Sequence, residues 1–328
     1  MELINDKIVL KGADDAVLKC NEGNYFIDLY IPPYGHDQVN EVSDSTYPLG
    51  NYRVPYHYHD RGIETFTVQK GHMELTLYGK RCICDEGDIV NIPPYVPHGM
   101  VFIDEGFVWR EMFSDMNMIA DHRDHDLVTR NFLPHAYNGD FMEGEYLPEH
   151  HYFGLPEPAA VEWVEKTDLP QITARESAVY SFDGIDGLSL SLKVGRWALK
   201  GLKEVWEIKL DKNYQLQYFD PSPSEGVYLV KSGRLMLEAD GKVLFPEAGD
   251  IVHVPQYTPY TLTALTDDAL VHDYNVTSRL FRMLEMLEAA EPAQRDDPEW
   301  VKWLKKANNC KLSGIEKTET ICSYTPPA

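Results

Sequence analysis

The chain contains one pattern twice, and this repeat limits its fold more than any other feature. The segments ETFTVQKGHMELTLYGKRCICDEGDIVNIPP and GVYLVKSGRLMLEADGKVLFPEAGDIVHVPQ keep matching turn positions 162 residues apart, as in Gly71 with Gly233 and Pro93 with Pro255. Between the turns, apolar, β-branched and aromatic residues alternate with polar ones, which is typical of short β-strands. Two copies of one all-β unit predict two barrels, because the period is far too long for a solenoid.

The remaining sequence predicts an arm, a connector and a helical tail. We expect five regions: an N-terminal arm (1–45), a first barrel (46–120), a connector (121–175), a second barrel (176–276) and a C-terminal helical tail (277–328). In the tail, Asp297 suits an N-cap and Pro298 the first position of a helix. Another helix would bury one apolar face against a barrel or a partner subunit: Leu280, Met283, Leu284 and Leu287.

The composition excludes several classes of partner. The formal net charge is −23, from 30 Lys and Arg against 53 Asp and Glu, which argues against nucleic acid or an anionic membrane. The first residues lack the features of a secretory signal, and no apolar run approaches the ~20 residues of a membrane helix. The five cysteines are scattered and odd in number, so we expect reduced thiols in a cytoplasmic protein, with Cys82 and Cys84 as packing residues.

Four residues around the first repeat form a candidate metal site. His57 and His59 are two apart on a predicted strand, so both rings project from one face. Glu64 begins the next strand, and His98 follows a proline-rich turn. Three imidazoles and a carboxylate suit one divalent transition metal, which is Fe, Mn, Ni, Co, Cu or Zn.

The spacing of these residues resembles the two motifs of the cupin superfamily. The match covers all four ligands together with Gly71, Gly87 and Pro93, and it departs at Tyr95, where the family often has glycine. The resemblance implies two tandem double-stranded β-helix (jelly-roll) barrels, as in the bicupins, with a metal inside the first. Quercetin dioxygenase-like bicupins are similar in their ligand set, whereas oxalate decarboxylases usually keep ligands in both barrels.

The second repeat lacks these ligands. At the offset of 162 residues, Glu64 corresponds to Gly226 and His98 to Tyr260. The paired histidines correspond to Phe219 and Pro221, or to Gln215 and Gln217 if the loop is longer. We therefore expect a metal-free second barrel, in which His253 and His272 are core residues. The connector holds five histidines, which favour a solvated or capping loop over a second metal site: His122, His125, His135, His150 and His151.

Alternation along the strands predicts further residues of the site. Arg53 would share the inward face of His57, where it would either bind a substrate carboxylate or enolate oxygen or pair with Glu111. Phe66 follows Glu64 on the same face and would form an apolar wall. Three more residues surround the motifs and would line the substrate pocket: Tyr95, Met100 and Trp109.

Three functions fit this site. The first is a quercetinase-like dioxygenase of a phenolic or enolisable small molecule, in which Glu64 is both ligand and base, as the resemblance implies. The second is a metal-dependent isomerase, lyase or decarboxylase that needs no O₂, with Arg53 as carboxylate anchor. The third is a small-ligand-binding protein without catalysis. A monomer and a homodimer are both compatible with two linked barrels.

Overall fold

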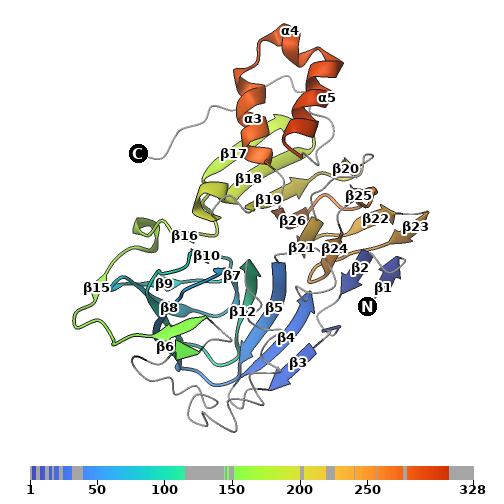
Figure 1. The fold of residues 1–328 in the computed structure, drawn as a ribbon. Coiled ribbons are helices and arrows are strands. Elements are labelled where there is room, and N and C mark those ends of the chain that lie inside the picture. Colours follow the sequence, from blue (N-terminus) through green and yellow to red (C-terminus); the bar gives the residue numbers. More distant parts are fainter. Residues whose placement is uncertain are drawn as a thin grey trace. The chain divides into compact units, whose positions relative to one another are not determined.

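A computed structural model describes residues 2–4, 8–11, 15–16, 18–21, 25–31, 40–114, 144, 146–147, 151–199, 203–218, 226–239, 241–255, 257–275 and 279–309. The chain forms two compact units. Unit 1 comprises Met1–Asp15 and Ala178–Ala328, and unit 2 comprises Ala16–Ser177. β-Strands are the main regular secondary structure of both units (Figure 1). Among the described helices, none is long and apolar enough to cross a membrane.

Unit 2 consists of two sheets, which we name after β5 and β6. The β5 sheet has the order β16 (Ile172–Thr173), β10 (Ile89–Ile92), β7 (Ile63–Lys70), β12 (Phe107–Ser114), β5 (Asn40–Tyr47), β4 (Phe26–Ile31) and β3 (Leu18–Asn21). The β6 sheet has the order β13 (Tyr146–Leu147), β14 (Tyr152–Gly154), β6 (Tyr52–His59), β11 (His98–Phe102), β8 (Met73–Leu77), β9 (Lys80–Cys84) and β15 (Glu162–Trp163). A short 3₁₀ helix, η2, spans Lys166–Asp168.

Unit 1 repeats this arrangement in its β19 and β20 sheets. The β19 sheet has the order β1 (Glu2–Ile4), β2 (Ile8–Lys11), β24 (Ile251–Val254), β21 (Gly226–Ser232), β26 (Ala269–Asn275), β19 (Glu204–Leu210), β18 (Leu188–Val194) and β17 (Tyr180–Ile185). The β20 sheet has the order β20 (Gln215–Tyr218), β25 (Tyr260–Ala264), β22 (Leu235–Ala239) and β23 (Lys242–Leu244). The 3₁₀ helix η3 spans Arg196–Leu199.

The repeat predicted from the sequence is confirmed at the level of strand order. The run β10-β7-β12-β5-β4-β3 in unit 2 matches β24-β21-β26-β19-β18-β17 in unit 1. The turns match as well. Gly87 and Gly249 have φ of 94° and 96°, a region that favours glycine, and their N–H groups donate to Val68 and Val230 at 2.8 and 2.9 Å. The expected fold class, two all-β jelly-roll units with helices near the C-terminus, is therefore correct.

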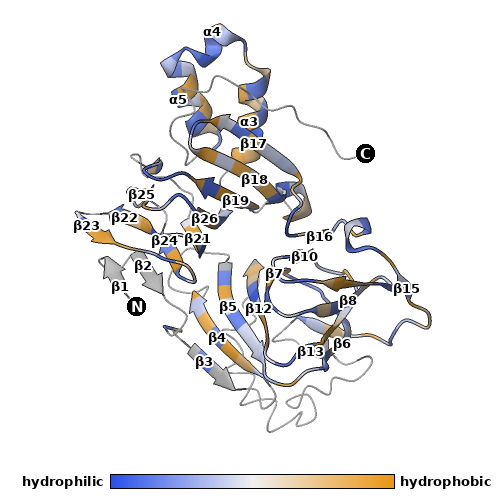
Figure 2. Cartoon of the chain, turned by 180° about the vertical axis from the view of Figure 1, so that it is seen from behind, coloured by the Kyte–Doolittle hydropathy of each residue, from blue (hydrophilic) through white to orange (hydrophobic). Residues whose placement is uncertain are grey.

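Each unit has its hydrophobic core between its two sheets. In unit 2, Phe66 and Trp109 of the β5 sheet share one buried cluster with Leu75 and Phe102 of the β6 sheet. Cys82 and Cys84 belong to that cluster, so they are packing residues as expected. Leucines at alternate positions of β18 are buried in unit 1, and β18 shows hydrophobic bands in Figure 2. The cores therefore follow the alternation that the sequence contains.

The C-terminal helices belong to unit 1. They are α3 (Leu280–Ala289), α4 (Pro292–Arg295) and α5 (Pro298–Ala307). The predicted face of α3, including Met283 and Leu287, is buried in the core of unit 1. Asp297 caps α5 by accepting a hydrogen bond from the N–H of Glu299 at 2.9 Å. Both helix predictions are thus confirmed.

Segments outside the predicted barrels also contribute strands. The arm supplies β1 and β2 to unit 1 and β3, β4 and most of β5 to unit 2, while the connector supplies β13 to β16. β2 pairs with β24, and β16 pairs with the corresponding strand β10, so an added strand covers the same edge in each unit. An isolated sheet edge offers unpaired backbone groups, and these additions satisfy them.

Lys203, next to β19, is a buried ionisable residue. Its side chain is 0% exposed, and its Nζ has no hydrogen-bond partner within the described residues. Burial lowers the pKa of Lys203 to about 7. Burying a charged ammonium group costs free energy, so a large fraction of the Lys203 side chains is deprotonated and neutral at pH 7.

Replacing Lys203 with methionine should stabilise unit 1 above neutral pH. The pKa of this lysine is about 7 when folded and 10.5 in the absence of burial. Between these values the unfolded state binds the extra proton, so the stability of the wild type rises with pH. At pH 8 the variant should gain roughly 3 kcal/mol, the free energy of discharging the ammonium group. Urea unfolding at three pH values between 7 and 10 measures both effects.

Lys193 provides the matched control, because it is similarly buried but its Nζ lies 3.5 Å from Glu207. Lys193→Met removes this ion pair and should lower stability while keeping the rise with pH. A Lys203→Met variant that retains the wild-type pH dependence would contradict the assignment.

Candidate metal centre

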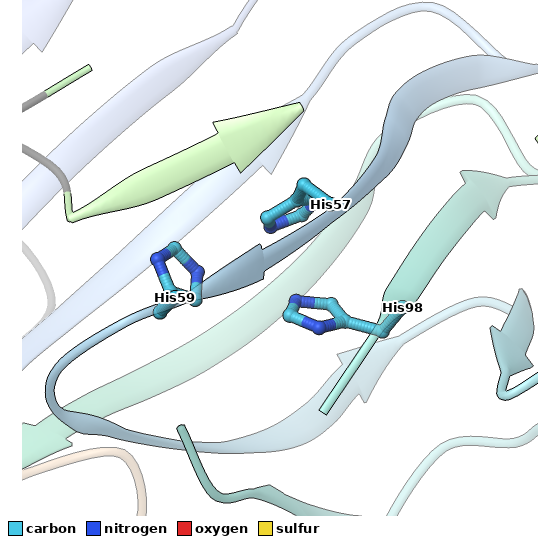
Figure 3. Close-up of side chains that lie close together, drawn as sticks. All are labelled: His57, His59 and His98. Carbon is cyan, nitrogen blue, oxygen red and sulfur yellow. The ribbon is translucent and has the colours of Figure 1, made fainter. Parts of the chain in front are cut away.

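Three histidines meet inside unit 2. His57 and His59 lie on β6, and His98 begins β11 directly opposite His57 in the strand register. Their potential ligand nitrogens all lie within 4.8 Å of one another, and all three residues are buried (Figure 3). The His57 and His98 ring centroids are 4.1 Å apart, and those of His57 and His59 are 5.0 Å apart. The sequence prediction that these residues converge is confirmed.

Backbone carbonyls orient two of the rings. His57 Nδ1 lies 2.7 Å from the carbonyl oxygen of Pro55, and His98 Nδ1 lies 2.8 Å from that of Val96. A carbonyl only accepts, so each Nδ1 carries the proton and donates it. The Nε2 atoms are then directed into the cluster. Metal-binding histidines commonly have such a partner on the second ring nitrogen.

Glu64 reaches the histidines from the opposite sheet. It lies on β7, and its Oε2 is 3.2 Å from His98 Nε2 and 3.7 Å from His59 Nε2. Glu64 and the histidines are all at most 5% exposed. The centre therefore joins the two sheets of unit 2 in a region that excludes water.

The electrostatics of the cluster suit a cation. Burial lowers the pKa of His57 well below its usual value, and the neighbouring His98 and His59 lower it further. Burial by itself would raise the pKa of Glu64, but His98 and His59 outweigh this effect and lower it. The cluster therefore combines a neutral imidazole with an ionised carboxylate, which is the protonation state that metal binding requires.

A second buried carboxyl group supports Glu64. Glu111 on β12 hydrogen-bonds with Glu64 and accepts a hydrogen bond from Ser45 Oγ at 3.1 Å. Burial raises the pKa of Glu111 well above its usual value, and the charge of Glu64 adds to this effect. Glu111 thus keeps its proton and donates it to Glu64. From the sequence alone, Glu111 is expected only as a possible partner of Arg53, although the alternating polar residues on β5 (Glu41, Ser43, Ser45) are buried and form a polar interior.

The donor set fits one divalent transition metal. Glu64 Oε2 and His98 Nε2 are buried and lack a hydrogen bond of good geometry within the described residues, so both are available as ligands. Three imidazoles with a carboxylate are typical for Fe, Mn, Co, Ni, Cu or Zn. His57, His59 and His98 are also the only group of three or more such side chains found close together in the described part of the chain. Glu64 as the fourth ligand stays a prediction.

The expectation that Arg53 faces the histidines is wrong. The register between β6 and β11 shifts, so that His98 lies opposite His57 but Met100 lies opposite Val54. This bulge contains Pro55, and it reverses the alternation on its N-terminal side. The Arg53 side chain is 56% exposed and forms an ion pair with Glu157 rather than Glu111.

The predicted pocket residues lie in two different places. Tyr95 is 63% exposed at a turn with φ of 63°, so it does not line an interior pocket, contrary to expectation. Phe66, Met100 and Trp109 are buried in the core of unit 2, and the rings of Phe66 and Trp109 are 4.6 Å apart. They form part of the packed core.

Tyr152 is a neighbour of the centre that the sequence analysis missed. It lies on β14, which runs beside β6 (Figure 3), with Tyr152 opposite His59 and Gly154 opposite His57. The Tyr152 ring stacks on His57 with centroids 4.1 Å apart. The only sequence signal is the aromatic pair in HHYFG, within a segment that we expected to be a loop.

Unit 1 fills the corresponding interior with tyrosines. Tyr228 and Tyr260, at the positions of Phe66 and His98, share a hydrogen bond between their hydroxyl groups. Gly226 replaces Glu64, and a Cβ there would lie 2.9 Å from both tyrosines. In the strand register, Tyr218 lies opposite Tyr260, as His57 lies opposite His98, so neither sequence alignment of the lost histidine pair was correct. This packing supports the expectation of a metal-free second unit.

The remaining histidines of the prediction have structural environments. His253 and His272 are buried in unit 1, and His272 Nε2 lies 3.1 Å from Glu207 Oε2. His151 Nδ1 lies 2.9 Å from Asp60 Oδ1. The other connector histidines lie outside the described residues: His122, His125, His135 and His150.

Alanine at His57 or His98 should abolish metal binding, because each substitution removes a buried imidazole donor. Elemental analysis after dialysis against one equivalent of Co²⁺ or Mn²⁺ measures this, while proteolytic resistance shows that unit 1 remains folded. His72→Ala, which changes an exposed histidine bound to Asp104, is the control and should bind normally. Stoichiometric metal in either site variant would contradict the ligand assignment.

Removing the support of Glu64 should weaken the metal site. Glu111→Ala takes away the hydrogen bond to Glu64 and should reduce Co²⁺ affinity by about 10–100-fold, as for other partners of metal ligands. Glu111→Gln keeps a donor and should lose less. Competitive titration with a chelator gives both affinities, and equal affinities of wild type and Glu111→Ala would refute the supporting role.

Comparison with known proteins agrees with this geometry. Residues 44–108 match the family model described as Cupin domain. A search of the curated proteins found no match.

Solved structures of oxalate decarboxylases share the fold. The formate complex of the Lactobacillus farciminis enzyme is 13% identical, with a TM-score of 0.54 over 92% of this chain and 97% of that chain. The Bacillus subtilis enzyme at pH 4.6 is 14% identical, with a TM-score of 0.51 over 93% of this chain and 87% of that chain. Residues 44–108 thus match a cupin domain, and the chain shares its fold with these decarboxylases.

Proposed function

We propose that this protein is a metal-dependent enzyme that decarboxylates a small carboxylic acid. The observation that carries the proposal is the enclosure of the centre. His57, His59, Glu64 and His98 are at most 5% exposed, and aromatic rings flank them. A ligand of a few atoms suits such a space better than a flavonol. The fold shared with oxalate decarboxylases over both units supports the same choice.

A divalent metal held by the four side chains would supply Lewis acidity and positive charge toward a carboxylate oxygen. The low exposure of the site strengthens this attraction, because little water screens it. The carboxylate anchor expected from Arg53 is not needed in this arrangement, since the exposed Arg53 is paired with Glu157.

The reaction needs a proton at carbon. When hydrogen oxalate is cleaved, the C–C bond breaks, CO₂ leaves, and the electron pair on the remaining carbon takes a proton to give formate. No net oxidant is consumed. Glu64 is the carboxyl group nearest to the imidazoles, so we assign the handling of this proton to Glu64. Glu111 holds a further proton one hydrogen bond away.

The dioxygenase reading is the second candidate, and it rests on the ligand set alone. Three histidines and one glutamate are compatible with both reactions, since fold and ligands do not fix the chemistry. The two reactions differ in their use of O₂. A dioxygenase incorporates both atoms of one O₂ per turnover, whereas decarboxylation of hydrogen oxalate needs none.

Incubation of the metal-loaded protein with oxalate should release CO₂ and formate in equal amounts, without stoichiometric O₂ uptake. Formate is measured by NMR and O₂ by an electrode, with malonate, pyruvate, catechol and a flavonol as alternative substrates. The His57→Ala variant is the control and should be inactive. O₂ uptake matched to a phenolic product would replace this proposal with the dioxygenase.

A further inference from the structure

The ligand space of the centre is bounded by different elements on each side of the histidines. Beyond His98 the β6 sheet continues through β8 and β9, where Leu75 and Leu77 form part of the core. Glu64 faces the histidines from the β5 sheet, and the Phe113 ring lies 6.4 Å from that of His59. On the His98 side, the sheet therefore leads into the buried core of unit 2.

The other side of the centre is closed by β14. In the order of the β6 sheet, β14 follows β6 on the side away from β11. Tyr152 is 3% exposed, and its ring lies nearly parallel to His57, at an interplanar angle of 18°. Its centroid is also 6.2 Å from that of His59. Tyr152 thus covers His57 and His59 on the β14 side of the centre, away from β11.

Three hydrogen bonds fix β14 around Tyr152. The Asp60 N–H donates to the carbonyl of His151 at 2.9 Å, and the His151 ring binds the Asp60 carboxylate. After the C-terminal end of the strand, the Leu155 N–H donates to the carbonyl of Tyr56 at 2.8 Å. The backbone of β14 is therefore fixed to β6 on either side of Tyr152, and this places the Tyr152 side chain over His57.

We propose that Tyr152 sets the size of the ligand that reaches the metal centre, admitting small carboxylates and excluding ring-bearing ones. This inference rests on the proposed function, from which it takes the ligand class. A phenol ring removed from the face of His57 leaves a space of similar size. That space is beside the metal ligands, so a larger carboxylate can occupy it.

The Co²⁺-loaded protein tests the proposal without any turnover. Acetate and benzoate are titrated separately, and their affinities are read from the visible absorption of the metal. The wild type should bind acetate at least tenfold more tightly than benzoate. Tyr152→Ala should raise the benzoate affinity at least tenfold and change the acetate affinity less than threefold. Tyr152→Phe keeps the ring and should behave like the wild type.

Phe153→Ala is the matched control, because Phe153 is the next residue of β14 and stacks on Tyr58 rather than His57. It should leave both affinities unchanged. If Tyr152→Ala loses its metal, Tyr152→Leu replaces it in the same titration. An unchanged ratio of the two affinities in the small variants overturns the inference, even in an active decarboxylase. A wild type that binds both acids equally overturns it too. A shifted ratio in a protein that does not cleave oxalate supports the size limit while the proposed reaction fails.

Discussion

The interior of unit 2 must hold several ionisable groups between two hydrophobic sheets, and the rest of the centre depends on how their charges are balanced. Glu41, Glu64 and Glu111 are all buried, and like charges at short range cannot all be ionised there. The structure resolves this conflict by giving Glu64 the imidazoles and Glu111 the proton. What remains is one negative group facing three imidazoles, and a dication complements that arrangement.

Unit 1 shows what the same scaffold does without this conflict. Its strand order is that of unit 2, but Gly226, Tyr228 and Tyr260 occupy the interior positions that carry Glu64, Phe66 and His98. The absence of a side chain at Gly226 is what lets the two phenol rings meet. In unit 1, two tyrosine rings joined by a hydrogen bond thus fill the space that holds the candidate metal ligands in unit 2. The jelly roll tolerates both solutions because its strands are fixed by turns such as those at Gly87 and Gly249.

Local sequence patterns predicted the strands, the repeat and the three histidines, because alternation and turn residues act over short distances. They failed where the pairing of distant strands determines the direction or the neighbours of a side chain. Arg53 follows the alternation of a regular strand, but a bulge at Pro55 turns it outward, and only the pairing with β11 reveals the bulge. Tyr152 lies 95 residues after His57 in the sequence, and its role depends on the pairing of β14 with β6. The protonation of Glu111 likewise depends on its burial and on Glu64, which lies on the paired strand β7.

The N-terminal hairpin of β1 and β2 constrains the order in which the two units can fold. Val9 on β2 pairs with His253 on β24, 244 positions later, whereas unit 2 is a continuous stretch. During synthesis, every residue of unit 2 is made before the partner strand of β2, so unit 2 can fold while the β1–β2 hairpin is still unpaired. Closing so long a loop is slow compared with local pairing. Until it closes, β24 has an open edge to which a strand from another molecule can add. The order of synthesis, and not only the final contacts, therefore affects the risk that unit 1 aggregates through the edge of β24 before β2 pairs with it.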